Sequence, residues 1–383
     1  MPVKDDVVGL FVKRFVIPGA QYFDKPGFVD FKISGITDIY ARQIFYPEDF
    51  FVKFEKDLVD KYGAEAKRAL YSIGKKFGYR FAQSGKFENI TNHPGEKIKD
   101  WVLIASKFVE GTYASAIENE TDPKLKRTDY HLKNFVILRK LGFDPIFAVG
   151  GSAGLMAWIY QDPSIEGVLH DVKKTDLGYE ATVTNAPSSY LKEQFKDVDI
   201  YEETNLSDLL EDFKSYKEFN KQVKTSSTKS FQTYLDAGFI SYKQGIVNIK
   251  DHRFFLFEVS GTYMLERELR KINPEYLDLL YESAFYSGEK IMSEFSTNLQ
   301  DVFDMLSALG WGEVLVFSSN EKQIQILLNH FPWCRWYTDV EFIIMKGFLS
   351  GILSAKKGKK IEFKKPAIDL NKGYLSLLFK ADL

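Results

Sequence analysis

Few residues in this sequence have the types and spacing that chemistry at a site requires. The five histidines, at positions 93, 131, 170, 252 and 330, fall singly, and none belongs to an HExxH or paired-ligand motif. The single cysteine, Cys334, excludes an internal disulfide and any multi-cysteine metal site. No Ser/His/Asp order, paired acidic motif or catalytic lysine context is found. We therefore predict no catalytic residue, no metal and no cofactor; a non-enzymatic protein is favoured, although an enzyme stays open.

One glycine-rich segment, Gly150-Gly151-Ser152-Ala153-Gly154, follows an apolar run that we interpret as a strand. Backbone N–H groups at the helix start after such a turn can hold phosphate. No Lys-Ser/Thr pair follows, and no acidic residue in a dinucleotide-binding context supports that reading. Since Gly347 and Gly351 repeat the spacing of Gly150 and Gly154, we favour close helix packing, in which glycine lets another backbone approach.

Aromatic residues are abundant, with 33 Phe, 21 Tyr and 5 Trp making 15% of the chain. Rings of this size fill cores and line apolar pockets. A cluster surrounds Cys334 in the segment FPWCRWY and includes Trp333 and Trp336. We interpret some of these rings as the cover of a pocket or an interface. We interpret Cys334 as a buried, inert thiol. The alternative is a reactive thiol whose pKa is lowered by Arg335.

Length and charge narrow the class of protein further. The 383 residues predict two to three domains, and 45% hydrophobic with 27% charged residues exclude a disordered chain. Because 51 Lys and Arg residues are balanced by 53 Asp and Glu residues, we expect no positive surface potential that would attract nucleic acid. The absence of a signal peptide, of a long apolar run and of further cysteines predicts a cytoplasmic protein without a membrane span.

The chain contains an internal repeat. The segment LYSIGKKFGYRF matches LYESAFYSGEKI with Tyr71 opposite Tyr281 and Gly78 opposite Gly288, both 210 positions apart (281−71). The same offset relates Gly35 and Ile36 to Gly245 and Ile246. Self-similarity of this kind indicates a duplicated domain.

Three later matches suggest further registers of the repeat. FVILRKLGFDPIF matches FDMLSALGWGEVL at offset 168 (309−141), GGSAGLM matches GFLSGIL at offset 197 (347−150), and Gly178-Tyr179 matches Gly373-Tyr374 at offset 195. The change from 210 to 168 predicts an insertion at about 83–130 in the first copy. The segment around Trp336 then has no counterpart there, so the first copy is interpreted as a scaffold that lost its pocket.

These matches define the expected architecture. We predict an α/β (α+β) fold of two repeated domains, each an antiparallel sheet with packed helices, forming an intramolecular pseudo-dimer. The first copy spans 1–185, a charged and partly helical linker spans 186–229, and the second copy spans 230–383. In each copy, Leu-Gly-aromatic closes a helix, with Gly142 or Gly310 after its last turn, where a left-handed backbone favours glycine.

The run GIVNI, LYESAFYSGEKI, LSALGWGEVLVF, MKGFLSGILSAKKGKKIEF and NKGYLSLLF resembles the 4-vinyl reductase (hydrocarbon-binding) domain family. This family is related in fold to Bet-type subunits of the transport protein particle and to sensor domains of aromatic-responsive transcription activators. The resemblance covers most of 245–379 and, more faintly, 29–184. It implies an apolar pocket between helices and sheet that takes hydrocarbon-like or aromatic ligands, and it implies dimerisation through helices.

From these observations we predict that the second copy binds or senses an apolar or aromatic small molecule without catalysis. The predicted ligand-binding residues are Tyr281, Phe285, Trp311, Trp336 and Phe348. A protein-interaction scaffold without ligand is the alternative, and a reductase-type enzyme on the same fold is a third. No nucleic acid partner is expected, and a homodimer or protein partner is left open.

Overall fold

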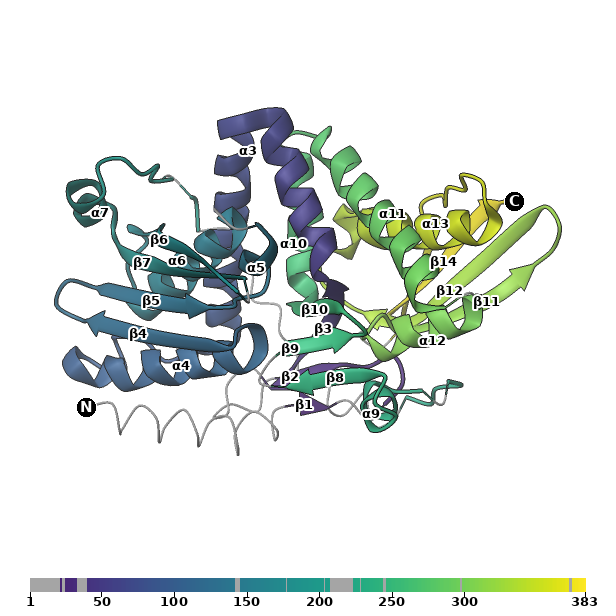
Figure 1. Cartoon of the computed structure of the whole chain (residues 1–383), viewed down its shortest axis with the longest axis horizontal. Helices are drawn as coiled ribbons and strands as arrows, with labels where there is room; N and C mark the ends of the chain where they lie inside the picture. The colour runs from purple at the N-terminus through teal and green to yellow at the C-terminus, as the bar shows by residue number, and fades with distance from the viewer. Residues whose placement is uncertain are drawn as a thin grey trace.

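The computed structural model describes residues 21–22, 25–32, 40–141, 145–176, 178–202, 204–206, 223–227, 229–243, 246–296, 298–371 and 374–383. We call 21–187 the first half and 229–383 the second half. In this part of the chain, one six-stranded and two four-stranded sheets form, all antiparallel. The six-stranded sheet lies between the halves, and each half has an outer sheet (Figure 1).

The central sheet is built by both halves. Its strand order is β1-β2-β3-β10-β9-β8, with β1 (Gln21–Tyr22), β2 (Asp30–Lys32), β3 (Tyr40–Pro47), β8 (Ile240–Lys243), β9 (Ile246–Ile249) and β10 (His252–Glu258). The halves join where β3 pairs with β10, and Phe45 lies opposite Leu256. Backbone hydrogen bonds of a sheet ladder therefore connect the two copies.

The two outer sheets have the same topology. The first-half order is β4-β5-β7-β6 and the second-half order is β11-β12-β14-β13. In both sheets, the strand that comes last in the chain therefore lies between the second and the third. The strands are β4 (Ala116–Asp122), β5 (Arg127–Lys133), β6 (Ile165–Thr175), β7 (Gly178–Pro187), β11 (Glu313–Ser319), β12 (Gln323–Pro332), β13 (Ala367–Asn371) and β14 (Tyr374–Asp382). The predicted α+β class with two repeated, sheet-containing halves is confirmed.

The principal helices also correspond. Helix α3 (Glu48–Ser84) breaks at Gly63, whose φ is 58° and ψ −131°, and its two parts match α10 (Val259–Ile272) and α11 (Tyr276–Phe295). Helix α4 (Ile98–Tyr113) matches α12 (Leu299–Ala308), and α6 (Ile146–Ile159) matches α13 (Ile343–Lys357). Smaller elements are η2 (Gly95–Lys97), α5 (Leu138–Leu141), α7 (Ser188–Gln194), α9 (Phe231–Asp236) and η3 (Tyr337–Asp339).

Local sequence explains where several of these helices begin and end. The Glu258 carboxylate accepts from Ser260 N at 3.0 Å and caps α10, and the Asn298 side chain accepts from Gln300 N at 3.1 Å at the start of α12. Side chains of this type satisfy N–H groups that the helix cannot pair. Gly310 follows the end of α12 with φ 92°, so the expected left-handed glycine is confirmed there.

Glycines bring two helix pairs into backbone contact, one pair in each half. A Cβ built on Gly78 or Gly150 would clash with the carbonyl oxygen of Gly151 or Tyr71, respectively, where α3 crosses α6. In the second half, a Cβ on Gly288 would clash with the Phe348 carbonyl oxygen. A Cβ on Gly347 would lie 2.7 Å from the backbone carbonyl oxygen of Tyr281. The predicted helix packing is confirmed, and it is the same in both halves.

The structure corrects the alignment of the two halves in the segment between α3 and α6, where the sequence suggested an offset of 168. Residues 138–141 form α5, after β5, whereas Phe303 lies in α12, before β11, so the offset of 168 pairs different elements. The proposed insertion at 83–130 contains α4, β4 and β5, which correspond to α12, β11 and β12. Because β4 begins at 116 and β11 at 313, the offset of 197 (313−116) already applies at the first outer strand, ahead of α6 and α13.

Three smaller expectations are also wrong. The run Ile146–Val149 forms the first turn of α6 rather than a strand, because a helix that is apolar all round resembles a buried strand over so short a run. The sequence pattern also predicts a last hairpin between Ile361–Phe363 and Tyr374–Phe379, whereas the last hairpin pairs β13 with β14. The segment around Trp336 has a first-half counterpart, since 134–145 also connects an outer strand to a helix. Gly35, Ile36, Gly142, Gly245 and Gly373 lie outside the described residues.

Two buried arginines connect each half to the other. Arg42 on β3 donates to the Gly27 carbonyl at 2.8 Å and to the His330 carbonyl, in the second half, at 3.4 Å. Arg253 on β10 donates to the carbonyls of Asn134 and Tyr113, in the first half, at 2.9 and 3.0 Å. Through these arginines, β3 and β10 each form hydrogen bonds with backbone beside the outer sheet of the opposite half.

The helix crossing in the second half can be tested with Gly288→Ala. We expect a loss of about 1–3 kcal/mol in the free energy of unfolding, because the new methyl group has no space against Phe348. This loss should outweigh the gain of about 1 kcal/mol in helix propensity. Glu282→Ala, on the exposed face of the same helix, should change stability by less than about 0.5 kcal/mol. Equal stabilities of the two variants in urea denaturation would contradict the tight crossing.

Candidate functional site

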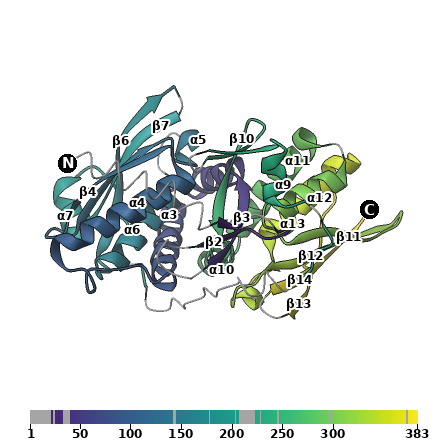
Figure 2. The same cartoon turned by 90° about the horizontal axis from the view of Figure 1, so that it is seen from below.

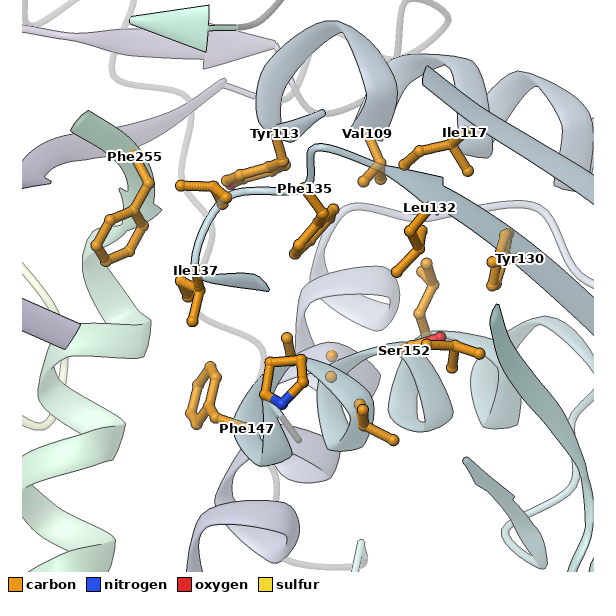
Figure 3. A pocket seen from close by; sticks show the side chains of 18 of the residues that line it. Val109, Tyr113, Ile117, Tyr130, Leu132, Phe135, Ile137, Phe147, Ser152 and Phe255 are labelled. Atoms are coloured by element: carbon orange, nitrogen blue, oxygen red, sulfur yellow. The ribbon is translucent and has the colours of Figure 1, made fainter. Parts of the chain in front are cut away.

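The main candidate site is an apolar cavity in the first half. It encloses about 210 Å³ between the second part of α3, α4, α6, the outer sheet and β10, and labelled side chains from several of these elements surround the hollow in Figure 3. The lining residues are Phe51, Phe77, Gly78, Phe81, Ala105, Ser106, Val109, Tyr113, Ile117, Tyr130, Leu132, Phe135, Val136, Ile137, Pro145, Phe147, Ala148, Val149, Gly151, Ser152, Leu155, Val183, Phe255, Leu256 and Phe257.

Both halves form the cavity wall. The crossing of α3 and α6 places Phe77 and Phe147 along one side, with ring centroids 6.0 Å apart. Phe255 and Phe257 close another side from β10 of the second half. Phe257 packs its ring 5.3 Å from Phe77 and 6.0 Å from Phe147. The site therefore depends on the pairing of β3 with β10, which holds β10 against the first half.

No lining residue has an acidic or basic side chain. The Ser106 hydroxyl donates to the Val102 carbonyl at 2.6 Å and accepts from the Asn119 amide at 3.0 Å, while Ser152 Oγ accepts from the Asn185 amide at 2.8 Å. These two hydroxyls already have partners within the protein. The cavity offers a ligand apolar contacts and neutral hydroxyl groups.

The two tyrosines of the wall stay neutral. Burial raises the pKa of Tyr113 well above its usual value, and the nearby carboxylate of Glu258 raises it further. Burial likewise raises the pKa of Tyr130, whose hydroxyl lies 3.0 Å from the Met156 sulfur. A phenolate would lose its hydration in this apolar site, so the protonated forms persist at neutral pH.

A buried ion pair lies beside the cavity wall. Arg80, on the same helix as Phe77, forms a buried ion pair with Glu258 at 2.7 Å. The Ser260 hydroxyl donates to the same carboxylate. Since a buried charge needs a partner, this pair holds the start of α10 to α3 and leaves the cavity wall neutral.

Two of the predicted site residues lie together in the second-half core. Trp311 and Phe348 are fully buried, each with 0% exposure, and their rings meet edge to face at 5.2 Å. Tyr46 packs 5.6 Å from Trp311 and 6.0 Å from Phe348. They fill the space between helix and sheet where we had predicted a ligand.

The other three predicted residues lie in different surroundings. Tyr281 and Phe285 are partly buried on α11, with ring centroids 6.1 Å apart. Trp336 is buried, and the Arg267 guanidinium lies 5.1 Å from its ring. Cys334 is buried, as expected. None of the five lines the first-half cavity, and their role in ligand binding stays a prediction. The cavity lies in the half that we interpreted as a scaffold.

The cavity was not predicted from the sequence for two reasons. Gly151 already lies opposite Phe348 in the match at offset 197 (348−151), but we interpreted that glycine only as helix packing. The offset of 168 hid the second correspondence, of Ala114 with Trp311 (311−114), which becomes visible only when the outer strands are aligned.

Comparisons with known proteins give a likeness among solved structures. No family model and no curated protein matches the chain. Among solved structures, the chain is similar to the phenol-responsive sensory domain of the transcription activator PoxR, solved with phenol. The two share 16% identity with a TM-score of 0.29, over 39% of this chain and 90% of that domain. At this TM-score, the likeness supports no argument about the ligand.

Two further properties of the described residues concern other kinds of site. None of the helices they form combines the length and the apolar character needed to cross a membrane. The same residues contain no group of three or more His, Cys, Asp or Glu side chains arranged to hold a metal ion.

Substitution of Trp311 distinguishes core packing from a pocket wall. Because the indole is fully buried against Tyr46 and Phe348, we expect Trp311→Ala to lower the free energy of unfolding by about 3–5 kcal/mol. Phe317→Ala, at a side chain that is 63% exposed on β11, serves as the control and should have little effect. A similarly small effect of Trp311→Ala, measured by chemical denaturation, would show that the indole borders open space.

Proposed function

We propose that the first half binds a neutral, apolar small molecule of aromatic size, and that the protein acts as a binding or sensing module. The observation that carries this proposal is the cavity of about 210 Å³, whose wall contains no charged side chain. A dry cavity of about 150 Å³ is large enough for benzene in another protein. The space therefore suits one or two fused rings.

The chemistry of the wall favours neutral ligands. Burial of apolar surface stabilises a complex by about 25 cal/mol per Å². A carboxylate or an ammonium group would lose its hydration here without gaining an ion pair from the wall, since no lining side chain is charged. Phe147 and Phe255 offer ring contacts to an aromatic guest.

We further propose that the chain is a tandem of 4-vinyl-reductase-like domains, as its motifs suggest. The matching strand orders β4-β5-β7-β6 and β11-β12-β14-β13 support a duplication. In this proposal the first domain, 1–185, holds the ligand, and 186–229 links it to the second domain, 230–383. The cytoplasmic location, and a homodimer or protein partner, stay predictions from the sequence.

Toluene and benzoate test the proposal, because they have similar size but differ in charge. We expect toluene to raise the melting temperature of the protein in proportion to ln(1 + [L]/Kd). Benzoate should bind at least about 100-fold more weakly, because its carboxylate must be buried without a partner. Binding can be measured by calorimetry and by ligand-observed NMR.

Phe317→Ala is the matched control for this experiment. It removes an exposed apolar ring in the second half and should leave toluene affinity unchanged. If toluene fails to bind up to its solubility in water, the proposed function is wrong and the scaffold alternative replaces it. Equal affinities for toluene and benzoate would contradict the neutral cavity.

A further inference from the structure

We propose that Gly151 is the specificity-determining residue of this site: it keeps the first-half cavity open and limits the size of the ligand. The choice of ligand rests on the proposed function, whereas the role of Gly151 in maintaining a void can be tested without any ligand. The structure supports the inference in three steps.

The first step is that helix packing does not require a glycine at position 151. A Cβ on Gly74, Gly150 or Gly154 would clash with the backbone of the helix opposite. A Cβ on Gly151 would have the backbone carbonyl oxygen of Gly74 as its nearest neighbour, at 3.8 Å. This distance is an ordinary van der Waals contact. Glycine in a helix interior is unfavourable relative to alanine. Among these four glycines, Gly151 therefore needs an explanation other than helix contact.

The second step is that Gly151 faces the cavity, whereas its counterpart fills the equivalent space. Gly78 packs against the backbone of Gly151, and Gly288 packs against the backbone of Phe348, so the two positions are equivalent in three dimensions. Gly151 belongs to the cavity wall. The Phe348 ring is fully buried and packs 5.3 Å from Phe50.

The third step is that a second ring accompanies Phe348. Trp311, 5.2 Å from Phe348, corresponds to Ala114 in the first half (311−114 is 197). In the second half, the Phe348 ring takes the place that a ligand takes in the first, and Trp311 packs against that ring. The chain therefore binds one small aromatic molecule at this position, in the half that has Gly151, and the equivalent space of the second half is filled by its own rings.

The series Gly151→Ala, Gly151→Leu and Gly151→Phe tests this role, with toluene and naphthalene as probes. We expect Gly151→Ala to keep toluene binding within about 3-fold while weakening naphthalene binding by at least about 10-fold. Gly151→Leu should weaken both probes, and Gly151→Phe should weaken toluene at least about 100-fold. The wild type should bind one toluene per chain. Affinity should thus fall as the side chain grows, with the larger ligand lost first.

Melting temperatures of the same variants provide the readout without ligand. Because the new side chain enters a void, Gly151→Ala and Gly151→Phe should melt at or above the wild-type temperature. Gly150→Ala, at the adjacent position in the helix contact, should melt well below it. Unchanged toluene affinity in Gly151→Phe, unfolding of Gly151→Ala, or two toluene molecules per wild-type chain would each overturn the inference.

The two proposals can fail separately. If wild-type protein binds no toluene but Gly151→Phe is as stable as the wild type or more stable, the cavity exists and Gly151 keeps it open, while the proposed ligand class is wrong. If toluene binds and Gly151→Phe binds it equally well, the ligand proposal stands and the role of Gly151 is refuted.

Discussion

The structure depends on the close approach of two helix backbones in each half. Glycines on α3 and α6, and on α11 and α13, leave no room for a Cβ at the crossing. This separation fixes how deeply α6 and α13 lie against the outer sheets, because a helix cannot move toward the sheet without leaving its partner. The space between helix and sheet then depends on the side chains that point into it.

The central sheet makes the two halves one unit. β3 and β10 pair across the boundary, and Arg42 and Arg253 each donate to carbonyl groups of the opposite half. The rings of Phe255 and Phe257 complete a cavity that otherwise belongs to the first half. In Figure 2, seen from below, β3 and β10 likewise lie between the two outer sheets. A ligand in the first half would therefore contact residues of the second.

The two halves have the same arrangement of helices and strands but differ in the side chains that fill the space between them. Helix contacts, strand order and the two buried arginines correspond between the halves, because each holds backbone in place and a change in any of them would disturb the fold. Residues that face the interior space are under a different constraint: the Phe348 ring fills it, whereas Gly151 leaves it open. The equivalent space is therefore packed in the second half and a cavity in the first.

The α+β class, the repeat around Tyr71 and Tyr281, and the glycine contacts could be predicted from the amino-acid sequence, since each follows from a local pattern at fixed spacing. It predicted ligand residues such as Trp311 because large rings are common in pockets, but such rings fill cores equally well. The tertiary structure shows Trp311 fully buried against Phe348, which residue types alone could not indicate. Burial and cavity volume arise from residues far apart in the chain, including β10 and α6, and no single segment records the space between them.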